Sequence, residues 1–180
     1  MFRYTCGLYM AHREERAYRR LKGIEGVPEL LERRWPDGLV IECIQGRNCL
    51  DQKNPNLSSA FFLRLRLLLQ SIRARRVLHG DVKRNVLVDI EGKPIIIDFG
   101  ASFVIPWWLH PMEKMILTLG ARYDERAVLK LKRQISPGML TVEEEAMICE
   151  LPLENVVKNV EGLIRTITRK IVNLEMRHGP

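Results

Sequence analysis

In the middle of the chain the spacing of apolar side chains changes from a helical to an extended pattern. Two short, mainly apolar runs, 86–89 and 94–97, surround the turn residues Glu91-Gly92, which predicts a β-hairpin. Residues 57–75 precede them with apolar side chains every three or four positions, which predicts a helix with one buried face. Those side chains are Phe61, Leu65, Leu68, Leu69 and Ile72. The polar segment 79–85 therefore joins a helix to a small hairpin, and the pattern argues against alternating βαβ units.

The first third of the chain contains a second pair of predicted elements. A helical pattern dense in Arg and Glu runs from about residue 8 to residue 21 and ends at Lys22-Gly23. The turn residues Trp35-Pro36-Asp37-Gly38 join residues 29–34 to the apolar run 39–44, which predicts another β-hairpin. A helix followed by a hairpin at each of two places indicates an α+β fold.

From about Met112 onward the pattern is helical to the end, with one interruption at Ser136-Pro137-Gly138. Thr141-Val142-Glu143-Glu144 has the spacing of a capping box, which predicts the start of the next helix. A last helix is predicted from about residue 153 to residue 177. The fold is therefore mostly helical in its second half.

Charge and cysteine content limit the partners and the cellular compartment that we expect for the protein. Lys and Arg number 29 against 22 Asp and Glu, a net charge of +7, which favours phosphates or an acidic membrane surface as partners. A generally solvated basic surface is the alternative, and the lack of alternating aromatic and basic residues argues against nucleic acid. No apolar run approaches the ~18 residues of a membrane span, and the cysteines form no metal or redox motif. We expect a cytoplasmic protein, with a peripheral place at the inner membrane face as a variant.

Two short motifs carry the candidate chemistry: His79-Gly80-Asp81-Val82-Lys83-Arg84-Asn85, and later Asp98-Phe99-Gly100. In this order, on a helix, a loop and a hairpin, they resemble the catalytic half of the protein-kinase-like fold. The resemblance implies that Asp81 orients the acceptor hydroxyl as a base and that Lys83 lies near the transferred phosphate. It also implies Asp98 and Asn85 as Mg²⁺ ligands, because phosphoryl transfer needs oxygen ligands for the metal. The alternative is a pair of unrelated aspartates that cap turns.

Two departures from the commonest kinase pattern refine the resemblance. Gly80 stands where most protein kinases have the arginine that pairs with a phosphorylated activation loop, which argues against activation by phosphorylation. His-Gly-Asp is similar instead to the RIO-type, lipopolysaccharide (Kdo) and aminoglycoside kinases. Asn85 follows Asp81 by four residues, where the family has five. Either the loop tightens and still delivers Asn85, or the second metal site is impaired.

The charged helix near the N-terminus resembles the kinase helix that carries the glutamate partner of the ATP-binding lysine. Residues 13–21, followed by Gly26-Val27-Pro28, are similar to that helix in small bacterial kinases related to the Kdo type. The resemblance implies Glu14 as the paired glutamate, with Glu15 as the second choice. A solvated helix with ordinary i,i+4 ion pairs is the alternative.

Residues 39–46 resemble the kinase hinge strand. The resemblance implies Ile41 as the gatekeeper and the backbone of Glu42 and Ile44 as the contacts of the adenine ring. It also implies that Leu87 packs beneath that base. Ordinary core packing is the alternative for each of these residues.

Two parts of the kinase pattern are missing. Only about a dozen residues precede the charged helix, too few for a Gly-rich loop and the strand with the ATP-binding lysine. Gly7 stands alone, and Lys22 lies beyond the helix. Arg3 or Arg13 is the available substitute, although a guanidinium copies an ammonium poorly. We therefore expect an incomplete N-terminal lobe, through a natural truncation or a gene model that starts too late.

The segment after Asp98-Phe99-Gly100 also departs from peptide-directed kinases, because it has no Ala-Pro-Glu motif. Asp124 either braces the catalytic loop from below or is an acid at a helix N-terminus. Trp107-Trp108 suggests contact with an interface or a substrate, with half-buried packing as the alternative.

Together these patterns predict an α+β, protein-kinase-like fold with a residual N-lobe at residues 1–50 and a helical C-lobe at 51–180. The resemblance implies a small atypical bacterial serine/threonine kinase. It would use ATP and Mg²⁺ to transfer the γ-phosphate to a hydroxyl group of a protein or a sugar. The alternative is a non-catalytic pseudokinase or truncated kinase-fold module that acts as a binding or scaffold protein.

Overall fold

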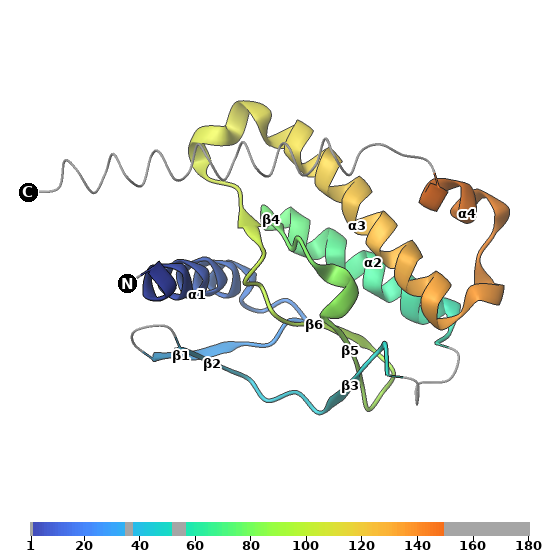
Figure 1. Ribbon diagram of the computed structural model, residues 1–180, viewed down its shortest axis with the longest axis horizontal. Helices are drawn as coiled ribbons and strands as arrows, with labels where there is room; N and C mark the ends of the chain where they lie inside the picture. The colour runs from blue at the N-terminus through green and yellow to red at the C-terminus, as the bar shows by residue number, and fades with distance from the viewer. Residues whose placement is uncertain (1, 35–37, 52–56, 150–180) are drawn as a thin grey trace, which may run out of the picture.

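The computed structural model of the chain describes residues 2–34, 38–51 and 57–149 (Figure 1). They form an α+β fold of helices and short strands, as the sequence predicts. The helices are α1 (Phe2–Leu21), α2 (Ser59–Ala74), α3 (Glu113–Ile135) and α4 (Val142–Cys149), with 3₁₀ turns η1 (Val82–Arg84), η2 (Trp107–Met112) and η3 (Pro137–Met139). The strands are β1 (Leu30–Arg34), β2 (Gly38–Ile41), β3 (Gly46–Asn48), β4 (Val77–Leu78), β5 (Val86–Asp89), β6 (Pro94–Ile96) and β7 (Phe103–Val104).

Helix α2 forms where the apolar spacing predicts it. Its N-terminus is capped by Ser58, whose side-chain oxygen accepts a hydrogen bond from the Phe61 amide at 3.4 Å. The buried face contains Phe61, Phe62, Leu65, Leu68, Leu69 and Ile72. The helix ends at Ala74, and Arg76, with a φ of 60°, turns the chain into β4.

Both predicted hairpins are present. Strands β1 and β2 pair antiparallel with Arg34 opposite Gly38, and β5 and β6 pair antiparallel with Val86 opposite Ile96. The strand predicted for residues 39–44 was too long, because regular pairing with β1 ends at Ile41. After that point the chain leaves the first sheet.

Strand β3 was missed by the sequence reading. Its three residues are all exposed, so they show none of the apolar alternation by which strands are predicted. β3 pairs antiparallel with β5, with Gly46 opposite Asp89. The two backbones come close there, since a Cβ on Gly46 would lie 3.0 Å from the Val88 carbonyl oxygen. Residues 42–45 therefore cross from one small sheet to the next.

Most of the buried side chains form one core that joins α1, α2 and the β5–β6 hairpin. The rings of Tyr18 and Phe99 meet edge-on in this core, with their centroids 5.0 Å apart. A smaller second core of Ile105, Leu109 and Ile116 lies where η2 meets α3. The main core contains residues from both sides of residue 50, so the two predicted lobes share their packing.

The helical C-terminal part agrees with its prediction up to Cys149. The interruption at residues 136–138 is present, and the predicted capping box forms in both directions. The Glu144 amide donates to Thr141 Oγ1, and the Thr141 amide donates to a Glu144 carboxylate oxygen, both at 3.2 Å. The helix predicted for 153–177 lies outside the described residues. Among the residues that are described, no helix is both long and apolar enough to cross a membrane.

Candidate functional site

His79 connects the candidate catalytic loop to the strand that precedes Asp98. It is fully buried, its Nε2 lies 2.9 Å from the Ile97 carbonyl oxygen, and the Asp81 amide donates to Nδ1 at 3.2 Å. Because Nδ1 accepts, the ring proton is assigned to Nε2 and is donated to Ile97. Burial lowers the pKa of His79, while the Ile97 bond and the charges of Asp98 and Asp81 oppose that shift. His79 therefore ties the backbone of the loop at Asp81 to the backbone at Ile97, the residue before Asp98.

Gly80 is required by its surroundings. Its φ is +84°, and a Cβ at this position would lie 2.7 Å from the Ala101 carbonyl oxygen. The Gly80 carbonyl accepts a hydrogen bond from the Tyr123 hydroxyl of α3 at 3.2 Å. The arginine of most protein kinases has no room here, because the chain after Asp98-Phe99-Gly100 packs directly against the loop.

The short spacing between Asp81 and Asn85 is accommodated by the 3₁₀ turn η1. The Asn85 amide donates to the Val82 carbonyl at 3.1 Å, and Asn85 Nδ2 donates to the Asp81 carbonyl at 2.9 Å. The loop is thus tight, with the Asn85 side chain bonded to the Asp81 backbone, and the use of Asn85 as a metal ligand stays a prediction. With Nδ2 used in this bond, Oδ1 is the atom of Asn85 suited to a metal.

Asp98 has a strained backbone that two neighbours hold in place. Its φ is 60°, a left-handed value that is uncommon for a non-glycine residue. Its amide donates to the Tyr18 hydroxyl at 3.3 Å, and its Oδ1 accepts from the Gly100 amide at 3.1 Å. The carboxylate is thus fixed at the turn after β6, on the exposed side of the main core. Such strain is often found at functional positions.

Of the two glutamates proposed for the lysine-pairing role, Glu14 is the one beside Asp98. Partial burial raises its pKa, the charge of Asp98 raises it further, and a hydrogen bond from the Phe99 amide opposes both. Glu15 is buried elsewhere on α1 and forms ion pairs with Arg19, at 2.9 Å, and with Arg33 of β1. Burial alone would raise the pKa of Glu15, but the hydrogen bonds from the two arginines lower it.

Arg13 holds the chain that follows the Asp-Phe-Gly motif. Its Nη2 donates to the Ala101 carbonyl at 3.0 Å, and its Nε donates to the Ser102 carbonyl at 3.1 Å. The guanidinium is thus engaged by backbone oxygens, which speaks against its predicted use as a substitute for the ATP-binding lysine. The side chain of Arg3, the other predicted substitute, lies outside the described residues.

The hinge residues lie between the first sheet and β3. Ile41 ends β2 and is half-buried, and Ile44 is half-buried in the crossing segment. The Glu42 amide donates to the Glu29 carbonyl at 2.8 Å, and the Glu29 amide donates to the Glu42 carboxylate at 3.2 Å. Leu87 lies on β5 opposite Ile95. The Glu42 amide is therefore occupied, while its carbonyl faces no β1 partner in this register.

Asp124 is not a helix N-terminal acid, because it lies in the middle of α3. Its carboxylate is 2.6 Å from Arg73 Nη1, at the end of α2, and only 3% of the residue is exposed. Burial raises the pKa of Asp124 to about 6, although the bond to Arg73 lowers it. Asp124 thus joins α2 to α3, and the contact with the loop comes from its neighbour Tyr123. The sequence reading missed Tyr123, whose only signal was its place beside Asp124.

Lys83, on η1, is half-buried, and no hydrogen bond to its side chain defines its position within the described residues. The described residues hold no cluster of three or more His, Cys, Asp and Glu side chains suited to a metal. Mg²⁺ in nucleotide sites needs only one or two carboxylates besides phosphate and water oxygens. Asp98 with Asn85 fits that donor set.

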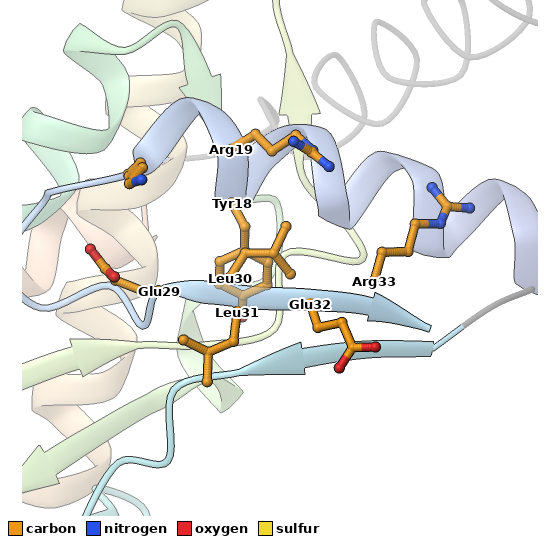
Figure 2. Close-up of a pocket in the computed structure, with 8 residues that line it drawn as sticks. Tyr18, Arg19, Glu29, Leu30, Leu31, Glu32 and Arg33 are labelled. Atoms are coloured by element: carbon orange, nitrogen blue, oxygen red, sulfur yellow. The ribbon is translucent and has the colours of Figure 1, made fainter. Parts of the chain in front are cut away.

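Figure 2 shows a pocket between α1 and β1. Its volume is about 170 Å³. Its lining is Tyr18, Arg19, Lys22 and residues 29–33. Lys22 therefore lies at this pocket, as expected for a lysine beyond the helix. The candidate residues Asp81, Asn85 and Asp98 do not line it.

No protein-family model matches the chain, and no curated protein matches it in sequence. Solved structures match it in fold. The complex of the Rio2 kinase from Chaetomium thermophilum with ADP/Mg²⁺-phosphoaspartate is similar with a TM-score of 0.59 and 17% identity, over 92% of this chain and 56% of that one. A second crystal structure of the Rio2 kinase from the same organism has a TM-score of 0.57 and 18% identity, over 79% of this chain and 45% of that one. The chain spans about half the length of these kinases, and it has an α+β fold of the protein-kinase-like type.

Proposed function

We propose that the protein is an ATP- and Mg²⁺-dependent phosphotransferase that acts on a hydroxyl group. The observation that carries the proposal is that the buried ring of His79 links the two motif segments: its Nε2 donates to the carbonyl of Ile97, next to Asp98, and its Nδ1 accepts from the backbone amide of Asp81. Asn85 is bound to the same loop. Asp98 does cap its own turn, since its Oδ1 accepts from the Gly100 amide. Turn capping does not explain why a buried histidine links the two motifs, whereas phosphoryl transfer needs a proton acceptor and metal ligands at a fixed separation.

In the proposed mechanism the acceptor hydroxyl lies at Asp81. The acceptor oxygen forms the new bond to phosphorus as the bond to the leaving ADP oxygen breaks, and its proton passes to Asp81. Lys83 neutralises negative charge on the transferred group. Asp98 and Asn85 would hold Mg²⁺, which supplies charge neutralisation on the phosphates.

The nucleotide base would lie against the crossing segment after β2. The Glu42 carbonyl and the Ile44 amide are the proposed contacts of adenine, because the Glu42 amide already donates to Glu29. Leu87 would pack beneath the ring. Glu14 would help to arrange the part of the site near Asp98, where Mg²⁺ would be held. These roles follow the resemblance to kinases and are proposals for this chain.

A non-catalytic kinase-fold module is the second candidate, favoured by the state of the basic residues near the site. Arg13 is bound to the backbone after the Asp-Phe-Gly motif, and Lys22 lies at the separate pocket of Figure 2. Within residues 2–34, 38–51 and 57–149, no strand contains a lysine that could bind the ATP phosphates. Such a module would bind nucleotide or a partner without turnover.

The acceptor class and the setting are also proposals. A protein serine or threonine, or a sugar hydroxyl, fits the chemistry of Asp81 equally. We place the reaction in the cytoplasm, because the described cysteines, Cys43 and Cys49, are free thiols. The relation to small atypical bacterial kinases with a truncated N-lobe is part of the same proposal.

Thermal unfolding and phosphate transfer together separate the candidates. Saturating Mg-ATP should raise the melting temperature of the full chain by roughly 5–10 °C, and Asp98→Asn should abolish that rise. Asp81→Asn should keep the rise but lose transfer of labelled γ-phosphate to hydroxyl acceptors. A rise without transfer in the wild type would favour a non-catalytic module that binds nucleotide. No rise at all would refute the phosphotransferase and favour a module that binds a partner without nucleotide.

A further inference from the structure

The surface formed by η2 and the first turn of α3 exposes an unusual amount of apolar side chain. Trp107 is 81% exposed, Trp108 36%, Met112 47% and Met115 48%. These four side chains, here called the Trp–Met patch, fall within nine consecutive residues. The packing role considered for the two tryptophans is therefore wrong for Trp107 and at most partial for Trp108.

The Trp–Met patch lies on a firm base. Leu109 of η2 is buried with Ile105 and Ile116 in the second core, and the Leu109 amide donates to the Pro106 carbonyl at 3.1 Å. The exposed side chains are thus displayed by a packed 3₁₀ turn and a helix. A partner would bind without first ordering this backbone, which lowers the entropic cost of docking.

The charge around the patch is positive. Between Phe99 and Tyr123 the sequence contains one acidic residue, Glu113, and two basic residues, Lys114 and Arg122, a net charge of +1. Glu113 is already paired, with Arg76 at 2.8 Å and with His110 at 3.3 Å. Lys114 and Arg122 are exposed on α3, and the chain as a whole has a net charge of +7. The surroundings therefore attract an anionic partner and repel a cationic one.

We propose that the Trp–Met patch docks the protein on the surface of a membrane that contains anionic lipids. Tryptophan prefers the depth of the lipid headgroups, since its ring is apolar and its N–H can still meet water or a headgroup. Exposed apolar side chains beside lysine and arginine bind anionic bilayers through both area and charge. The proposal goes beyond phosphoryl transfer and does not depend on it.

Sedimentation with vesicles tests the docking directly. The full chain should sediment with vesicles of phosphatidylcholine and phosphatidylglycerol, and much less with phosphatidylcholine alone. Trp107→Ser combined with Trp108→Ser should weaken binding about tenfold or more. Ile90→Ser is the matched control, because Ile90 is also a large exposed apolar residue, 84% exposed, at the β5–β6 turn. It should bind as the wild type does, and melting temperatures should show that both variants are folded.

Tryptophan fluorescence identifies what covers the patch. With Trp35 replaced by Phe, emission reports on Trp107 and Trp108 alone, and anionic vesicles should shift it to shorter wavelength. Three results would overturn the proposal: no sedimentation of the wild type, equal binding by the double variant, or short-wavelength emission already present without lipid. The last result would mean that the chain or a second copy covers the patch, and light scattering would separate those two.

Discussion

The two sides of the candidate nucleotide site are built in contrasting ways. On the catalytic side, the Asp98 amide donates to Tyr18 of α1, Tyr123 of α3 donates to the Gly80 carbonyl, and His79 links the two motif segments to each other. On the hinge side, β1 and β2 form a two-stranded sheet that is joined to α1 by the ion pair of Glu15 with Arg33 and packs Leu30, Leu39 and Ile41 against the main core. Two-stranded sheets are marginal by themselves. The catalytic side is therefore held by hydrogen bonds to its backbone, whereas the proposed base-binding side depends on one ion pair and apolar packing.

The largest effect is expected from a methyl group on the catalytic side. Gly80→Ala should lower the free energy of unfolding by about 4 kcal/mol, since its φ is positive and Cβ meets the Ala101 carbonyl at 2.7 Å. Gly92→Ala is the matched control: its φ is +76°, but nothing lies within 4 Å of the added Cβ. It should cost about 1–2 kcal/mol. Equal losses in urea unfolding would show that the loop is not closely packed.

Next in size is the buried pair below the catalytic side. Arg73→Met leaves the Asp124 carboxylate buried without its ion pair, which should cost about 3 kcal/mol at neutral pH. Arg75→Met, at the exposed end of the same helix, should change stability by less than about 0.5 kcal/mol. Urea unfolding of the two variants at neutral pH gives the comparison.

The same pair should make stability depend on pH. The pKa of Asp124 is raised from 3.8 in the unfolded chain to about 6, so the folded state binds more protons between these values. Its contribution to stability is therefore present below about pH 4 and is lost as the pH rises through about 6. In Arg73→Met the loss should extend to higher pH. A stability difference from wild type that does not shrink on acidification would contradict the assignment.

On the hinge side, Glu15→Gln should have an intermediate and local effect. The variant loses the charge that pairs with Arg33 and Arg19, which should lower the free energy of unfolding by about 1–2 kcal/mol. Amide exchange should become faster in β1 and β2 while β6 stays protected. Glu32→Gln, whose pair with Arg34 is exposed at 3.8 Å, should leave exchange unchanged. Faster exchange throughout the protein would mean that the hinge is as firmly built as the catalytic side.

The smallest change in stability should come from Tyr123→Phe, which removes only the hydroxyl bound to the Gly80 carbonyl. We expect a loss of about 1 kcal/mol, with slower phosphate transfer and unchanged Mg-ATP affinity. Tyr18→Phe removes the hydroxyl that holds the Asp98 amide, so it should weaken Mg-ATP affinity instead. Identical kinetic effects of the two variants would show that neither tyrosine acts through its own motif.

The sequence predicted the structure best where the spacing of apolar residues and the position of turn residues indicate the same element. Helix α2 and the hairpins follow from local pattern, because their buried positions and turns are encoded within a few residues. The order of the two motifs then indicated the fold that the solved structures support. The roles of Asp81, Lys83, Asn85 and Asp98 remain predictions.

The parts that could not be predicted depend on contacts distant in sequence. The side chains of strand β3 are exposed, and the strand forms because its backbone pairs with the edge of β5. From the sequence, Arg13 was expected to be available as a substitute for the ATP-binding lysine. Only the fold brings it to the carbonyls of Ala101 and Ser102, which lie 88 and 89 residues away. For Asp124 the sequence left two alternatives open, a brace of the catalytic loop or an acid at a helix N-terminus, because nothing nearby in the sequence indicates Arg73 as its partner.

The pairing of β4 with β7 has a consequence for how this site can change. Val77 lies opposite Val104 and Leu78 opposite Phe103, so the two ends of residues 77–104 are neighbours in space. Everything between them, including both motifs, leaves and returns to the scaffold at one place. The same stretch also supplies Val82, Val86 and Ile96 to the main core. An exchange of the whole stretch must therefore preserve its buried side chains, whereas an exchange of either motif alone would separate His79 from the Ile97 carbonyl to which it is bonded.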